Sequence, residues 1–86
     1  MYSVELGRVA RRTFERAAAS LQRRLDRCFD RLKVEPHFDG NIKPLKGKLA
    51  GHYRYRVGDY RVIYRIDEHG SVVHVLKIAH RSEAYG

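Results

Sequence analysis

Arginines recur at alternate positions in the second half of the chain, and tyrosines or aliphatic residues occupy the positions between them. The stretches YRYRV and YRVIYRI both show this pattern, which is the period of an extended strand. A helical layer covers only one face of a small sheet, so we expect the arginines to gather on the uncovered face. The arginines concerned are Arg54, Arg56, Arg61, Arg65 and Arg81.

Phosphate is the ligand that such a row would suit. Clustered guanidinium groups repel one another unless an anion lies among them, and Asp59 is the single acidic residue between Leu45 and Arg65. The planar guanidinium also binds phosphate through two parallel hydrogen bonds. Three lysines precede the first of these strands and are expected to add charge at the edge of the same surface. They are Lys43, Lys46 and Lys48.

The composition supports a polyanionic partner. The formal net charge is +8 in 86 residues, which attracts nucleic acid, an acidic protein or an anionic membrane surface. A basic surface that serves only solubility is the alternative. No apolar run is long enough to span a membrane or to form a signal peptide, and Cys28 is alone. We therefore expect one domain over residues 1–86 in the reducing cytoplasm, with no metal site and no cofactor.

Hydrophobic periodicity predicts the elements that position these residues. Residues 2–6 alternate like a strand, and helical spacing then begins at Arg8. A second helix follows, with Ser20 as its expected N-cap, and Pro36 lies beyond its end. Residues 34–51 are interpreted mainly as loop, and three antiparallel strands follow. The prediction is an α+β fold, in which an N-terminal strand and a helical hairpin pack on a mainly antiparallel four-stranded sheet.

Most of the remaining conspicuous residues are given structural roles. The tyrosines inside the strands are expected to be mainly core, and Cys28 lies on the apolar stripe of the second helix. His37 falls in the predicted loop and is interpreted as solvated surface. The helix arginines are interpreted either as a solvated face or as a contact surface for nucleic acid.

The C-terminal half carries a resemblance to a known family. The segments LKGKLAGHYRYRVGDYRVIYRID and VLKIAHRSEAY resemble the RelE family of bacterial toxins, which are the toxin halves of type II toxin–antitoxin pairs. The resemblance covers nearly the whole chain in the order of its elements and is specific in these two segments. It implies a RelE-like fold and a ribosome-dependent endoribonuclease that cuts messenger RNA in the ribosomal A site. In that reaction the ribose 2′-OH attacks the adjacent phosphate and the 5′-oxygen leaves, without a metal.

The resemblance also implies roles for individual residues. Arg61 matches the arginine that stabilises the transition state, and Arg81 matches the one on the phosphate and leaving group. Arg54 and Arg56 match basic residues that hold phosphate. Tyr85 matches a C-terminal tyrosine that stacks on a base and acts as general base. His80 is a further candidate for acid–base work. The expected RNA-binding residues are Lys43, Lys46, Lys48, Arg54, Arg56 and Arg65.

Two alternatives use the same sequence features. The related ParE toxins inhibit DNA gyrase on the same fold, and the joint presence of Arg54, Arg61, Arg81 and Tyr85 favours the ribonuclease instead. A nucleic-acid-binding protein without catalytic activity would also need a basic face. In both toxin interpretations the expected partner is a cognate antitoxin that contacts the helical hairpin and the sheet edge, together with ribosomal RNA and messenger RNA for the ribonuclease.

Overall fold

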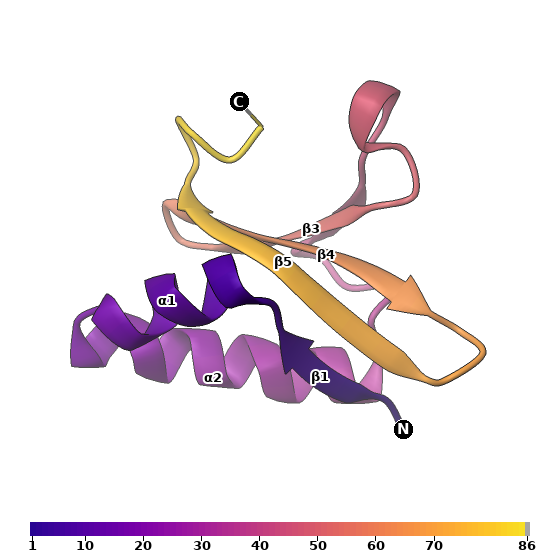
Figure 1. Ribbon diagram of the computed structural model, residues 1–86, viewed down its shortest axis with the longest axis horizontal. Coiled ribbons are helices and arrows are strands. Elements are labelled where there is room, and N and C mark those ends of the chain that lie inside the picture. Colours follow the sequence, from indigo (N-terminus) through magenta and orange to yellow (C-terminus); the bar gives the residue numbers. More distant parts are fainter. Residues whose placement is uncertain (86) are drawn as a thin grey trace.

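Two helices follow the first strand and cover one face of the sheet in the computed structural model, which describes residues 1–85 (Figure 1). Helix α1 spans Arg8–Arg16 and α2 spans Ala19–Val34. The predicted N-cap at Ser20 is wrong: the chain turns earlier, and the N-cap position is Ala18, whose backbone is extended. The Gln22 side chain lies nearby and donates a hydrogen bond of 2.7 Å to the Phe14 carbonyl. Within residues 1–85, no helix is long and apolar enough to cross a membrane.

The sheet has five strands in the order β1-β5-β4-β3-β2. Strand β1 is parallel to β5, and the other neighbouring pairs are antiparallel. The strand bounds are β1 Ser3–Leu6, β2 Ile42–Pro44, β3 Tyr53–Val57, β4 Tyr60–Asp67 and β5 Val72–His80, with a short 3₁₀ helix η1 at Gly47–Leu49. The predicted α+β fold is confirmed. The strand beyond the four predicted is β2, which lies in the segment interpreted as loop. It was not predicted, because three residues that end in a proline are too few to show alternation.

The β3–β4 hairpin turns through two residues, as the Gly58-Asp59 pair predicted. Val57 pairs with Tyr60, and Gly58 has a φ of +58°. A positive φ at the first central position is the pattern of a type II′ turn, where glycine avoids the steric cost of a side chain.

The main core lies between the helices and one face of the sheet. Leu25, Cys28 and Leu32 of α2 pack with Val62 and Tyr64 of β4. The Tyr64 hydroxyl is buried, and it donates a 2.8 Å hydrogen bond to the Pro36 carbonyl. The expectation that the strand tyrosines are mainly core is confirmed, since the others pack in or against this cluster.

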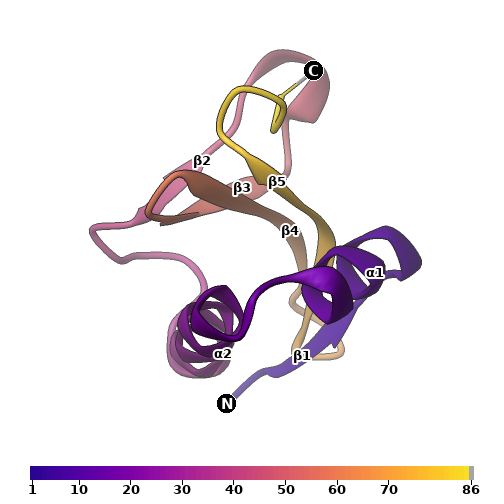
Figure 2. The ribbon, with the colours of Figure 1, turned by 90° about the vertical axis from the view of Figure 1, so that its left-hand side faces the viewer.

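Neither α1 nor α2 lies across the opposite face of the sheet (Figures 1 and 2). The segment that contains η1 and the tail after β5 both rise from this face, while α1 and α2 lie on the other side (Figures 1 and 2). We call it the open face.

Candidate functional site

Strand alternation directs three arginines to the open face. Tyr55, Val57 and Val62 are buried on the helix side, so their sequence neighbours point the opposite way. Arg56 lies directly across from Arg61, and Arg54 lies across from Ile63. The strand register therefore places these three arginines on the uncovered face, as the alternation in the sequence predicted.

A cavity of about 650 Å³ lies on this face, between the η1 segment and the C-terminal tail. Six of its lining residues are Lys or Arg and none is acidic. None of the six forms an ion pair with a carboxylate anywhere in residues 1–85. We call this site the cationic cavity, and it is lined by Lys43, Pro44, Leu45, Lys46, Lys48, Leu49, Arg54, Arg61, Arg81 and Tyr85.

The β3–β4 turn holds two of the arginines. One guanidinium nitrogen of Arg61 donates to the carbonyls of Gly58 and Tyr60, both at 3.0 Å. The carbonyl between them, that of Asp59, accepts the backbone N–H of Arg81 at 2.7 Å. The Gly58 and Tyr60 carbonyls thus orient the Arg61 side chain, and the Asp59 carbonyl between them fixes the backbone at Arg81.

Edge strand β2 positions the other side of the cavity. Arg54 donates a 2.7 Å hydrogen bond to the Asn41 carbonyl, and Lys43 is its direct partner across the β2–β3 pair. Lys46 and Lys48 come from the segment around η1, whose Leu45 N–H is held by the His52 carbonyl at 2.9 Å. The loop lysines and the strand arginine therefore reach the same cavity from different elements.

The C-terminal tail folds back over the open face and presents Tyr85. Lys77 donates to the Glu83 carbonyl at 3.0 Å, and the Glu83 N–H bonds to the His80 carbonyl at 2.8 Å. Ala84 is 3% exposed, whereas Tyr85 is 49% exposed. The anchored backbone leaves the tyrosine ring accessible at the cavity wall.

Three residues predicted for the site do not line the cavity. Arg56 and Arg65 are exposed on the open face outside it. His80 pairs with Tyr60, and their rings meet edge to face with centroids 5.7 Å apart. Its Nδ1 atom lies 3.0 Å from the Ser82 hydroxyl. The His80 ring thus contacts its own turn and Tyr60 rather than the six cations.

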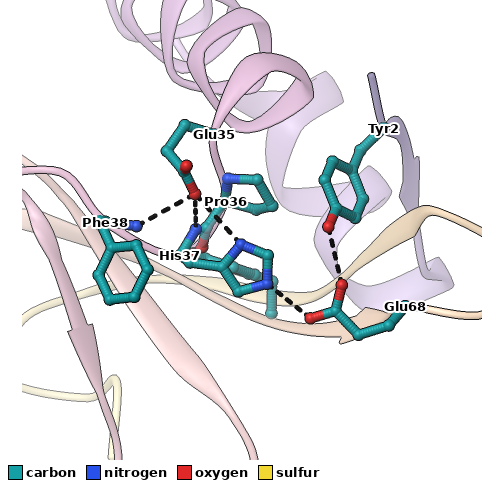
Figure 3. Close-up of polar contacts among 7 residues, drawn as sticks. Tyr2, Glu35, Pro36, His37, Phe38 and Glu68 are labelled. Atoms are coloured by element: carbon teal, nitrogen blue, oxygen red, sulfur yellow. Dashed lines mark hydrogen bonds and ion pairs between the residues drawn. The ribbon is translucent and has the colours of Figure 1, made fainter.

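A polar cluster at the other end of the sheet was missed by sequence reasoning (Figure 3). His37 was interpreted as solvated surface, which is wrong: its two ring nitrogens face Glu35 and Glu68. Glu35 also accepts the backbone N–H groups of His37 and Phe38, and Tyr2 donates to Glu68 at 2.7 Å. Only the Glu35–His37 spacing was visible in the sequence, because Glu68 comes from the distant β4–β5 turn.

The hydrogen bonds of this cluster shift its titrations. Bonding to Glu68 raises the pKa of His37, with a further contribution from Glu35. The backbone N–H of His37 lowers the pKa of Glu35, and the His37 ring lowers the pKa of Glu68. Since carboxylates only accept hydrogen bonds, both ring nitrogens of His37 donate when it is protonated.

Comparisons with known proteins bear on what this arrangement is for. Residues 5–85 match the family model described as "ParE toxin of type II toxin-antitoxin system, parDE". The chain belongs to the RelE/ParE toxin family. This match, together with the RelE and RelG relatives described next, confirms the family resemblance found in the sequence.

Individual relatives of this RelE/ParE chain include two Mycobacterium tuberculosis toxins. Toxin RelG is 41% identical over 58 residues, which cover 67% of this chain and 64% of RelG. Toxin RelE is 44% identical over 57 residues, which cover 66% of this chain and 57% of RelE. The chain thus matches less than two thirds of the length of either relative.

Solved structures match over more of the fold. The RelBE2 toxin–antitoxin complex of M. tuberculosis gives a TM-score of 0.82 at 32% identity, covering 93% of this chain and 98% of that one. The RelE–RelB complex of Pyrococcus horikoshii gives 0.81 at 30% identity, with 96% and 98% covered.

Proposed function

We propose that this protein is a type II toxin with ribosome-dependent endoribonuclease activity, cutting messenger RNA in the ribosomal A site. The observation that carries the proposal is the cationic cavity, where six unpaired cations surround a space beside an accessible tyrosine. Such a site suits a backbone phosphate and the extra negative charge that develops on it during cleavage. Relatives named RelE and RelG support the same proposal.

The reaction requires attack by the ribose 2′-OH on the adjacent phosphate and departure of the 5′-oxygen. We assign Tyr85, in its phenolate form, to accept the proton of the 2′-OH, because it carries the accessible hydroxyl among the cavity residues; water returns a proton to the departing 5′-oxygen. Arg61 and Arg81 stabilise the charge on the phosphate and the leaving oxygen. Arg54 is assigned an electrostatic role, since a guanidinium stays protonated and cannot act as a base.

The surrounding cations extend the RNA contact beyond the reacting phosphate. Lys43, Lys46 and Lys48 lie where the η1 segment borders the cavity, and we assign them to the RNA backbone. Arg56 and Arg65 continue the positive surface along the open face. The contacts of His80 with Tyr60 and Ser82 favour a role in positioning Arg81, its neighbour in the chain.

The test is a reconstituted translation reaction in which message ends are mapped by primer extension. We expect cuts within A-site codons that depend on ribosomes, and a large loss of cutting with Tyr85→Phe, which keeps the ring but removes the hydroxyl. Thermal unfolding of the variant should match the wild type. Intact messages at toxin concentrations that stop bacterial growth would refute the proposal.

A cognate antitoxin is the proposed partner, as in the RelBE2 and RelE–RelB complexes. The sheet edge at β2 offers an apolar groove of about 370 Å³, with Ile42 and Tyr53 among its lining residues. Phe38 also lines this groove and is 82% exposed, so it adds accessible apolar surface at the same edge. We propose that the antitoxin covers this edge and the helical hairpin.

Inhibition of DNA gyrase is the second candidate, because the matching family model is that of ParE. A supercoiling assay separates the two functions. Inhibition of gyrase by the purified chain, with messages left uncut, would favour the ParE activity. Uninhibited supercoiling alongside A-site cleavage would exclude it.

A further inference from the structure

The cavity residue Arg54 is held by a contact that lies outside the cationic cavity. Its guanidinium donates a 2.7 Å hydrogen bond to the carbonyl of Asn41, the residue just before strand β2. The same carbonyl also accepts the backbone N–H of Arg56 at 2.9 Å. A carbonyl oxygen has two lone pairs, so this oxygen can fix both the guanidinium and the β3 backbone beside it. The position of the Arg54 side chain therefore depends on the orientation of the Asn41 carbonyl.

Asp39 sets the orientation of that carbonyl. The Asn41 carbonyl and the Ile42 N–H belong to one planar peptide unit, and this N–H donates to the Asp39 carbonyl at 2.9 Å. The Asp39 side chain holds the preceding peptide unit, because its Oδ1 atom accepts the Asn41 N–H at 3.0 Å. Aspartates commonly close turns by accepting the N–H two residues further on. Asp39 thus fixes two successive peptide units and directs the carbonyl towards Arg54.

Helix α2 holds the Asp39 carboxylate in turn. Arg31 donates to the other carboxylate oxygen at 3.0 Å. The Asp39 side chain is only 12% exposed, and a carboxylate so far removed from water is costly unless it is hydrogen-bonded. The Asn41 N–H, followed by Arg31, lowers the pKa of the Asp39 carboxyl, so this group is ionised at neutral pH. A connected series of hydrogen bonds therefore runs from α2 through Asp39 to the cavity arginine.

We propose that Asp39 is a positioning residue for Arg54, acting through the peptide unit between Asn41 and Ile42. Asp39 is not among the residues that line the cationic cavity, so it influences a phosphate there through the arginine. An ion pair that only joined α2 to the sheet would need the Arg31 contact alone, whereas Asp39 also orients the peptide unit that Arg54 binds. The inference rests on the proposed function in taking Arg54 to contact the RNA phosphate.

The first test measures phosphate binding by the purified chain and needs no ribosome. Inorganic phosphate is titrated into the wild type, Arg54→Ala, Asp39→Ala and the double variant, and its affinity is read from NMR shifts. We expect Arg54→Ala to weaken phosphate binding by about tenfold, the usual effect of losing one hydrogen bond to a charged group. Asp39→Ala should also weaken binding, by at most the same factor. It should add almost nothing when Arg54 is already alanine.

The sign of this effect separates orientation from overall charge. Removing the negative charge of Asp39 would by itself strengthen the binding of an anion, so weaker binding identifies the lost orientation of Arg54. Asp30→Ala is the matched control, because it removes a carboxylate that pairs with Lys33 on α2, and neither residue lines the cavity. Its phosphate affinity should equal or slightly exceed that of the wild type.

A spectroscopic signal and a conservative variant separate positioning from a loss of folding. The guanidinium N–H signals of Arg54 should exchange slowly with water in the wild type and rapidly in Asp39→Ala. Asp39→Asn keeps an oxygen that can accept the Asn41 N–H, so it should retain slow exchange and most of the phosphate affinity. Thermal unfolding reports the stability of each variant, and binding is measured at a temperature at which all of them are folded.

Cleavage on ribosomes should follow the same pattern as phosphate binding. We expect Asp39→Ala to lower the single-turnover rate by up to about 10²-fold, the loss that a misplacement of about 1 Å can cause. In the Arg54→Ala background the same substitution should cause little further loss, because the residue that it positions is already absent.

An equal effect of Asp39→Ala in both backgrounds would overturn the inference, because it would show a role in stability alone. Phosphate affinity that is unchanged by Asp39→Ala, or by Arg54→Ala, would also overturn it. Absence of phosphate binding at millimolar concentration would overturn it together with the phosphate role of the cavity. Phosphate binding in the expected pattern without any A-site cleavage would refute only the ribonuclease and leave the positioning role of Asp39 standing.

Discussion

At the end of the sheet that carries the β4–β5 turn, His37 lies between two carboxylates, whereas near the β3–β4 turn six cations line a cavity without one acidic side chain. Both regions are polar, lie at the surface and combine residues far apart in the sequence. In the first, Tyr2, Glu35 and Glu68 satisfy one another and the histidine within the chain (Figure 3). In the second, the charges have no such partners.

This difference separates a structural cluster from a binding site. Opposite charges that meet inside the folded chain contribute to folding and leave little for a ligand to gain. Like charges held together by backbone hydrogen bonds, as Arg54 and Arg61 are, cost stability through their repulsion. An anion in the cavity relieves that repulsion, so binding and folding are coupled there.

The largest effect should come from removing one cavity arginine. We expect Arg81→Ala to lower A-site cleavage by about 10²–10³-fold, the usual loss when one group that stabilises a developing charge is deleted. Arg65→Ala removes a charge from the same face outside the cavity and should cost far less. Single-turnover cleavage rates on stalled ribosomes measure both. Equal losses in the two variants would show that overall charge, rather than the cavity, governs the reaction.

The lysines beside the cavity should affect salt dependence. Each phosphate contact on single-stranded RNA contributes about 0.7 to the slope of log affinity against log salt concentration. The double variant Lys43→Ala, Lys46→Ala should therefore reduce that slope by about 1.4. Fluorescence titration with a short RNA over a range of salt concentrations gives the value. Lys33→Ala is the control, because Lys33 lies on α2 near Asp30, and a similar reduction there would contradict the prediction.

A smaller effect, confined to stability, is expected from a substitution on the face of the sheet that the helices cover. Tyr64→Phe leaves the buried Pro36 carbonyl without its donor, at a cost of about 1–3 kcal/mol. Thermal unfolding should shift down by about 4–8 °C per kcal/mol in a domain of this size. The control is Tyr53→Phe, since the Tyr53 ring stacks on Tyr64 and its hydroxyl has no partner among residues 1–85. Cleavage by folded Tyr64→Phe protein should equal that of the wild type.

The sequence predicted most of the fold because its signals are local. Strand alternation gave the faces of Arg54 and Arg61, and Gly58-Asp59 gave the hairpin register. The features that were predicted wrongly or missed depend on sequence signals that are weak, or on residues that are distant in the chain. Ser20 has the chemistry of an N-cap, but the helix begins one residue before it. Strand β2 is too short to show a period and forms only because β3 lies beside it.

The site followed the same division. The cations could be named because their types and spacing are visible, but the apolar residues beside them in the cavity could not. Leu49 reaches the cationic cavity from η1, a short element with no sequence signature of its own. His80 is the neighbour of Arg81 in the chain, which suggested that the two share the chemistry. Strand alternation and the hydrogen bond with Ser82 instead direct the His80 ring towards Tyr60.

The smallest effect, and the one that tests the His37 cluster, is on the pH dependence of stability. The folded-state pKa of His37 is raised above its usual 6.5, so its contribution is complete below that pH and is lost as pH rises through the raised value. The pKa values of Glu35 and Glu68 are lowered from 4.5, so their contributions are present above that pH and are lost in acid. All three stabilise the fold together between these limits.

We therefore expect the melting temperature of the wild type to fall modestly as pH rises from about 5 to about 8, the range in which histidines lose their charge. His37→Gln keeps hydrogen-bond donors but cannot titrate, so its melting temperature should change less over the same range. Differential scanning calorimetry at constant ionic strength measures both profiles. His69→Gln is the control, because His69 lies in the exposed β4–β5 turn and should retain the wild-type dependence. Parallel profiles for wild type and His37→Gln would show that the cluster contributes no charge-dependent stability, and would remove the contrast with the cationic cavity.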